Sequence, residues 1–196
     1  SSHFSKGIFN HKIISNQRSF DAGCLSLYQT LHTNCYNNKR IMDNFEIVDF
    51  SSLSKEVQRM VEGAADIRKR AYCPYSNFAV GSTILTEEDS KIYTGCNIEN
   101  SALGPSICAE RAAIAKAVCD GYLKFKTVTV VANQQSFTAP CGVCRQMLNE
   151  FCGTNNDIDI YLSRPAMDKV LCTKLSQLLP LSFVSYQKDN AENGVA

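Results

Sequence analysis

Two short cysteine motifs constrain this chain more than any other feature of its sequence. The first is Cys108-Ala109-Glu110 and the second is Pro140-Cys141-Gly142-Val143-Cys144. Together they offer three thiolates to one metal ion and leave the fourth position of a tetrahedral Zn²⁺ open, which distinguishes a catalytic site from a closed structural one. Glu110 lies two residues from a ligand, where it can exchange protons with water at that position. We therefore predict one Zn²⁺ per chain, with Glu110 as the catalytic residue and three metal ligands: Cys108, Cys141 and Cys144.

Other interpretations of these cysteines remain open at this point. A C-x-x-C motif alone is also typical of a structural zinc half-site or of a redox pair. A closed structural site needs a fourth ligand, which one of the other cysteines could provide, whereas a redox pair has no use for a second motif containing Glu110. The presence of both motifs favours the catalytic interpretation. The seven remaining cysteines are interpreted as small apolar packing residues or surface thiols: Cys24, Cys35, Cys73, Cys96, Cys119, Cys152 and Cys172.

The periodicity of the sequence predicts a layered α/β domain. Apolar residues at i, i+3, i+4 and i+7 predict an amphipathic helix after Ser54, a plausible N-cap. Residues 79–85 and 91–96 read as the two strands of a hairpin. Helices over 108–120 and 141–152, strands over 127–132 and 158–162, and a last helix over 173–179 follow. In this arrangement all three cysteine ligands lie at helix N-termini, whose positive potential favours thiolates.

Four sequence blocks, spread over about two thirds of the chain, resemble a known enzyme family. The stretch from about residue 54 to 183 is similar to cytidine deaminases of the small, homotetrameric, three-cysteine class. The resemblance implies a three-layer α-β-α sandwich around a mixed sheet, and hydrolytic deamination of cytidine and 2′-deoxycytidine to uridine and 2′-deoxyuridine in pyrimidine salvage. The blocks are AYCPYSNFAVG (71–81), GCNIEN (95–100), ICAER (107–111) and PCGVCRQ (140–146).

The same resemblance implies how the substrate and the metal charge are handled. Asn97 and Glu99 would hold the ribose 3′-hydroxyl, although Glu99 taken alone is equally typical of a solvated surface acid. Phe78 would pack against the pyrimidine, and Ala109 would contact the base through its backbone. Arg111, rather than Arg145, would offset the net negative charge of three thiolates on Zn²⁺.

The resemblance also implies a shared pocket, and it has departures. Phe183 would enter the active site of an adjacent subunit of a homotetramer, the alternative being that it covers its own core. Leu103 stands where relatives often have an aromatic residue, and Ala139 where a hydroxyl residue is common. These two departures bear on the packing of the ribose and on a hydrogen bond to the base, but not on the chemistry.

Composition excludes several classes of partner, but alternative functions remain open. Lys plus Arg (20) nearly balances Asp plus Glu (19), so we expect no nucleic acid partner and no anionic membrane surface. We also expect no membrane span, and reduced cysteines in a cytoplasmic protein. The alternatives to a nucleoside deaminase are a nucleotide or polynucleotide deaminase, which usually has His as the first ligand, and a non-catalytic zinc scaffold.

The chain divides into a domain and flanking segments. Residues 1–41 hold one acidic residue against five basic ones and are rich in Ser and Asn. That composition resembles a transit peptide, but amphipathic Arg spacing is missing. We therefore expect a disordered extension, or sequence upstream of an ordinary start at Met42. Residues 42–53 are interpreted as a linker, 54–187 as the deaminase domain and 188–196 as a C-terminal tail.

Overall fold

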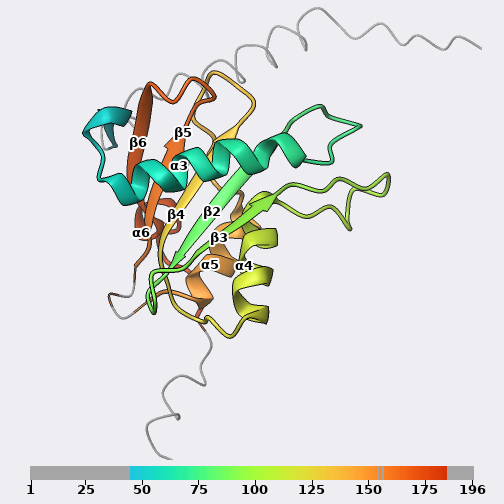
Figure 1. Ribbon diagram of the computed structural model, residues 1–196. Coiled ribbons are helices and arrows are strands. Elements are labelled where there is room, and N and C mark those ends of the chain that lie inside the picture. Colours follow the sequence, from blue (N-terminus) through green and yellow to red (C-terminus); the bar gives the residue numbers. More distant parts are fainter. Residues whose placement is uncertain (1–44, 154, 156, 185–196) are drawn as a thin grey trace, which may run out of the picture. The chain divides into compact units, whose positions relative to one another are not determined.

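A computed structural model of the protein describes residues 45–153, 155 and 157–184 (Figure 1). The predictions for the extension at 1–41 and for the tail at 188–196 lie outside these residues. No helix within the described part of the chain combines the length and the apolar character needed to cross a membrane.

A six-stranded mixed sheet forms the centre of the domain, with strand order β1-β6-β5-β4-β2-β3. Only β4 and β5 pair in parallel, and the other neighbours are antiparallel. The predicted hairpin of β2 and β3 is confirmed. The strands are β1 (Glu46–Asp49), β2 (Val80–Thr86), β3 (Ile92–Cys96), β4 (Phe125–Ala132), β5 (Asp159–Ser163) and β6 (Lys169–Lys174).

Two predictions about chain segments are wrong. Residues 46–49, interpreted as part of a linker, form β1 and pair with β6 at the edge of the sheet. The last helix was assigned to begin at Thr173. Thr173 and Lys174 instead form the end of β6, and the helix begins at Leu175. The strand β1 therefore belongs to the domain, because its backbone groups are paired within the sheet.

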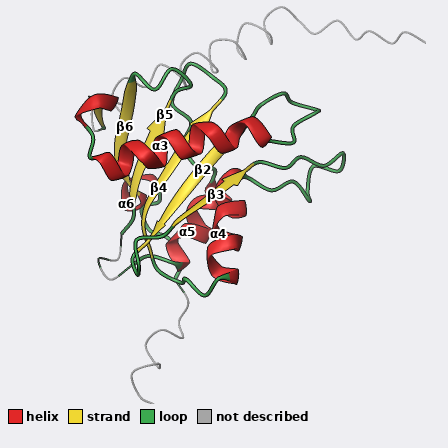
Figure 2. Cartoon of the chain, viewed as in Figure 1, coloured by secondary structure: helices red, strands yellow, loops and turns green. Residues whose placement is uncertain are grey.

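Helices cover both faces of the sheet, so the predicted three-layer α-β-α architecture is confirmed (Figures 1 and 2). Helix α3 (Lys55–Ile67) lies on one face, and its N-cap Ser54 accepts a hydrogen bond from the Val57 amide as expected. Helices α4 (Ala109–Cys119) and α5 (Gly142–Glu150) lie on the other face. Short helical segments complete the fold: η1 (Phe50–Ser52), η2 (Arg68–Arg70) and α6 (Leu175–Leu178).

Strand β4 carries the core because its side chains alternate between the two helical layers. Val128 and Val130 join the larger apolar cluster under α4 and α5. Val131 points the other way and packs with α3. A strand buried on both faces reads as a continuous apolar run, and this explains why β4 was evident from the sequence.

Gly95 sets how closely α4 approaches the sheet. A Cβ atom added there would lie 2.3 Å from the carbonyl oxygen of Ala109 and 2.5 Å from the amide nitrogen of Ala113. Both are backbone atoms of α4, so no side-chain rotation can relieve the contact. Glycine at this position therefore lets the first turn of α4 rest directly on β3.

Gly95→Ala is expected to destabilise the domain and displace the N-terminus of α4. Overpacking typically costs about 1–3 kcal/mol, which in a domain of this size lowers Tm by roughly 2–12 °C. Thermal unfolding and zinc content of the purified variant measure the two effects. Gly104→Ala is the matched control, because an added Cβ there meets nothing within 4 Å. Equal stability of the two variants would contradict this account of the packing.

Candidate active site

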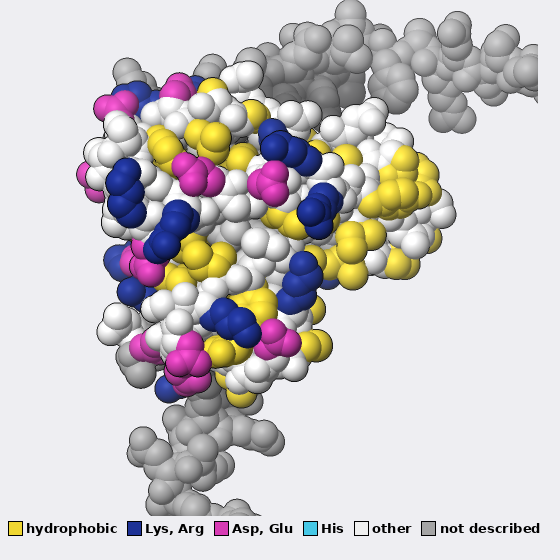
Figure 3. Space-filling model, in the orientation of Figure 1, with side chains coloured by type: hydrophobic (Ala, Val, Ile, Leu, Met, Phe, Trp, Pro, Cys, Tyr) yellow, Lys and Arg dark blue, Asp and Glu magenta, His cyan; other side chains and the backbone are white. Residues whose placement is uncertain are grey.

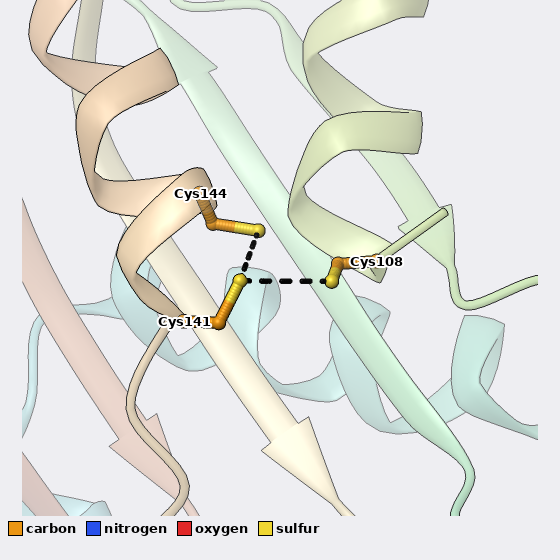
Figure 4. Close-up of side chains that lie close together, drawn as sticks. All are labelled: Cys108, Cys141 and Cys144. Carbon is orange, nitrogen blue, oxygen red and sulfur yellow. Dashed lines mark hydrogen bonds between the residues drawn. The ribbon is translucent and has the colours of Figure 1, made fainter. Parts of the chain in front are cut away.

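Three cysteine side chains converge where α4 and α5 begin. Cys108 is the N-cap of α4, Cys141 is the N-cap of α5, and Cys144 lies on the first turn of α5. The Cys108 and Cys141 sulfur atoms are 3.8 Å apart, and those of Cys141 and Cys144 are 3.5 Å apart. Figure 4 shows the three sulfur atoms approaching one another from the two helix ends. The predicted ligands thus meet at one point.

This geometry fits a zinc ion. Tetrahedral Zn–S bonds of about 2.3 Å place sulfur atoms about 3.8 Å apart. All three sulfur atoms lie within 4.8 Å of one another, and among the described residues they form the only such group of His, Cys, Asp or Glu ligand atoms. No fourth protein ligand completes the group within that part of the chain, which favours an open zinc site over a closed structural one.

Contacts among the thiols and with Arg111 change the pKa values of Cys108 and Cys144. A hydrogen bond from Cys144, together with the Arg111 guanidinium, lowers the pKa of Cys108 to about 5. The same hydrogen bond to Cys108, together with burial, raises the pKa of Cys144. Three thiolates in mutual contact repel one another, so a positive ion between them is needed for all three to be ionised.

Arg111, and not Arg145, faces the cysteine cluster. The Arg111 Nη2 atom lies 3.8 Å from the Cys108 sulfur and donates a hydrogen bond to the carbonyl of Ser106 at 2.8 Å. Arg145 instead donates to the carbonyl oxygens of Pro140 and Leu178, both at 2.7 Å. The positive charge closest to the thiolates therefore comes from Arg111.

Glu110 is buried beside this cluster on the first turn of α4, with only 4% of its surface exposed. Burial, followed by the negative charge of Cys108, raises the pKa of this carboxyl to about 6. An acid–base group works best when its pKa lies near the operating pH, because it must both accept and release a proton. Glu110 has this property at neutral pH.

Asn97 and Glu99 hold the loop that precedes β2. The Asn97 amide accepts a hydrogen bond from Val80 N and donates one to Phe78 O, both at 2.8 Å. Glu99 accepts hydrogen bonds from the backbone amides of Tyr75 and Ser76 and from the Ser76 hydroxyl. That hydroxyl is the largest cause of the lowered pKa of Glu99.

The two side chains keep a defined residual capacity for hydrogen bonding. A carboxylate has about four lone-pair sites, so the three bonds that Glu99 makes within the described part of the chain leave one acceptor site. Asn97 retains one N–H donor after its bond to Phe78. A hydroxyl group that donates to Glu99 and accepts from Asn97 fits this remainder.

Comparisons with known proteins agree with this geometry. Residues 54–156 match the model for the cytidine and deoxycytidylate deaminase zinc-binding region. A cytidine deaminase from Sporosarcina psychrophila is 44% identical over 128 residues, which are 65% of this chain and 91% of the relative. The chain belongs to this deaminase family.

Two further relatives support the assignment. A probable cytidine deaminase from Dictyostelium discoideum is 40% identical over 112 residues, which are 57% of this chain and 73% of the relative. The crystal structure of a cytidine deaminase from Burkholderia pseudomallei superposes with a TM-score of 0.60 at 36% identity, covering 67% of this chain and all of that one. The deaminase fold predicted from the sequence is thus confirmed.

In this deaminase, the remaining predicted site residues differ in how much of their surface is exposed to solvent. Phe78 is half-buried and packs against the larger apolar cluster, and Ala109 is fully buried at the start of α4. Phe183 leaves 73% of its surface exposed, so its ring does not cover the core of its own domain. Leu103 is 81% exposed in the loop between β3 and α4.

Two residues that the sequence analysis did not single out hold parts of this site. Ser76 donates to Glu99 and accepts from Phe78 N at 3.0 Å, so it links the carboxylate to the aromatic residue. Gln146 binds the backbone of Phe183. Both lie within sequence blocks that carry the family resemblance. That position is the only feature of the sequence that could have indicated a role in the site. Their partners lie 23 and 37 residues away along the chain, which no local pattern indicates.

Ser76→Ala is expected to lower kcat/KM for cytidine by about tenfold, because a hydrogen bond to a charged group is lost. Without that bond the pKa of Glu99 rises toward its ordinary value, so more of the carboxylate is protonated in acid. The increase in KM should therefore be larger at about pH 5 than at pH 7. The exposed Ser101→Ala is the control. An unchanged KM at both pH values would contradict a role for Ser76.

Proposed function

We propose that this protein is a zinc-dependent cytidine deaminase. It converts cytidine and 2′-deoxycytidine, with water, into uridine and 2′-deoxyuridine plus ammonia, as a step of pyrimidine salvage. The observation that carries the proposal is the burial of Glu110 beside three convergent cysteine thiols. A non-catalytic zinc scaffold has no use for a buried carboxyl at this position, because burial makes its ionised form costly.

Different residues have different roles in the proposed reaction. Cys108, Cys141 and Cys144 would hold Zn²⁺, which supplies Lewis acidity for the attack of water on the C4 carbon of the base. Glu110 accepts a proton from the attacking water and delivers it to ring N3. It then carries a second proton, taken from the hydroxyl group now bonded to C4, to the amino group, which leaves C4 as ammonia. One carboxyl acts first as base and then as acid, which suits a pKa near neutrality.

The nucleoside pocket is built on Phe78, Asn97 and Glu99, with Ala109 beside the base. The residual donor of Asn97 and the residual acceptor of Glu99 suit a free ribose hydroxyl, which both accepts and donates. A phosphate at the 3′ position would offer only acceptors and would be repelled by Glu99. This supports a free nucleoside over a polynucleotide as the substrate. Cys108, where nucleotide and polynucleotide deaminases usually have His, supports the same conclusion.

The proposal includes a homotetramer in the cytoplasm. Exposed apolar side chains gather where the loops at 71–79 and 97–107 project from the domain (Figure 3), and patches of this kind mark association surfaces. They include Tyr72, Tyr75, Ile98, Leu103 and Ile107. The exposed ring of Phe183 would complete the pocket of a neighbouring subunit. Within the described part of the chain, Cys73, Cys96, Cys119 and Cys172 form no disulfide, as is typical of a reducing compartment.

A substrate panel tests this function. The absorbance change on deamination is followed with cytidine, 2′-deoxycytidine, free cytosine, dCMP and a cytosine oligonucleotide. We expect the two nucleosides to be turned over efficiently and cytosine poorly. Binding energy from contacts to the sugar is used to lower the barrier at the base, and free cytosine lacks the sugar. A preference for dCMP or for the oligonucleotide would favour the rival deaminase functions.

Glu110→Gln is expected to abolish turnover while leaving about one zinc per chain. The amide is nearly isosteric but cannot transfer protons, and acid–base groups contribute about 10²–10⁴-fold to the rate. Cys144→Ala should lose both zinc and activity, because its sulfur is one of the three ligands. Cys119→Ala, which removes an exposed thiol, is the matched control. A Glu110→Gln enzyme with a tenth of the original rate or more would contradict the mechanism.

A further inference from the structure

The side-chain amide of Gln146 binds the backbone of Phe183 in both directions. Its Nε2 atom donates to the Phe183 carbonyl oxygen at 3.0 Å, and its Oε1 atom accepts from the Phe183 amide at 3.3 Å. An amide side chain paired in this way holds the two peptide groups on either side of one residue and so fixes the backbone orientation of that residue. Gln146 therefore holds the one exposed aromatic residue in the described part of the C-terminal segment.

The segment that leads to Phe183 follows a strained path. Arg145 holds the carbonyl of Leu178 at 2.7 Å, and Gln146 holds Phe183. Between these two attachments Leu181 is fully exposed and adopts a left-handed backbone conformation with φ of 57°. This conformation is unfavourable for a leucine, so it persists only where surrounding contacts hold it. The two hydrogen bonds between Gln146 and the Phe183 backbone supply such a contact.

Fixing the position of Phe183 adds little buried apolar surface to its own domain. An aromatic side chain buries a large apolar area when it meets a partner, yet Phe183 leaves 73% of its surface in solvent. A fixed backbone under an exposed ring lowers the entropy cost of binding a partner surface. The arrangement is thus suited to presenting the ring to another molecule.

We propose that Gln146 is a positioning residue that acts in trans, by holding Phe183 in place for the nucleoside pocket of the neighbouring subunit. This inference rests on the proposed function and on the shared pocket within it. Gln146 lies two residues after Cys144 on α5. It therefore connects the metal-binding helix of one chain to the substrate pocket of the next.

The competing explanation is a local one, in which Gln146 supports Cys144 in its own chain. The two explanations differ in which subunit suffers from a substitution. If Gln146 acts through Phe183, the variant chain is a poor donor of the ring but its own site remains intact. If Gln146 acts on Cys144, the variant chain has a damaged site of its own but donates a normal ring.

Subunit mixing between paired variants distinguishes these cases. Gln146→Leu, which removes both hydrogen bonds, is expected to lower kcat/KM for cytidine about tenfold with zinc content and assembly state unchanged. Gln146→Glu, which keeps the acceptor for Phe183 N but loses the donor, provides a second and nearly isosteric variant. Glu150→Leu, at an exposed position of the same helix, is the control and should keep full activity.

Under conditions that exchange subunits, Gln146→Leu mixed with Glu110→Gln should gain activity severalfold above the mean of the two parents. Some sites then combine an intact Glu110 with a ring held by an intact Gln146. Gln146→Leu mixed with Phe183→Ala should show no gain, because every donated ring is absent or poorly held. The reverse pattern, or full activity of both Gln146 variants, would overturn the inference.

One reference mixture separates this inference from the proposal on which it rests. Glu110→Gln mixed with Phe183→Ala should recover activity if pockets are shared between subunits. No recovery there would remove the shared pocket, and with it the role of Gln146. Failure of the unmodified enzyme to deaminate cytidine would instead remove the proposed function itself.

Discussion

The rest of the site depends on the meeting of two helix N-termini at one point beside the central sheet. The partial positive charge of each helix end favours ionised sulfur, and Cys108, Cys141 and Cys144 are placed there by the first turns of α4 and α5. The same turn of α4 buries Glu110 against the cluster, which raises the pKa of its carboxyl. The proposed metal binding and proton transfer thus share one structural cause. Gly95 allows it, because a larger residue would push α4 away from β3.

The pocket around this centre is organised by hydrogen bonds from side chains to backbone. Asn97 holds the peptide groups on either side of Ala79, and Glu99 holds the turn at Tyr75 and Ser76. Hydrogen bonds that order a loop before a ligand binds lower the entropy cost of binding. The residues assigned to sugar recognition are therefore also the residues that shape the loop carrying Phe78. Substitutions at Asn97 or Glu99 should be interpreted with both roles in mind.

Features with a local signature could be predicted from the sequence. Helix α3 was evident from its amphipathic period, β4 from its continuous apolar run and α4 from its small residues, because burial leaves a local mark on each sequence. Strand β1 was missed because it has only four residues, of which three are exposed, and therefore shows no alternation. The start of α6 was placed too early because β6 and the helix follow one another without a break, and only pairing with β5 identifies Thr173 and Lys174 as strand.

The sequence by itself determined the family, and it predicted the three cysteine ligands and the acid–base carboxyl, because their chemistry requires certain residue types at short, fixed spacings. Only the tertiary structure decided which arginine faces the thiolates, since Arg111 and Arg145 occupy similar positions after their motifs but point to different partners. It also decided that Ser76 donates a hydrogen bond to Glu99 and that Gln146 is hydrogen-bonded to the backbone of Phe183. These contacts join residues far apart along the chain, and they exist because the packing of helices on the sheet brings distant segments together.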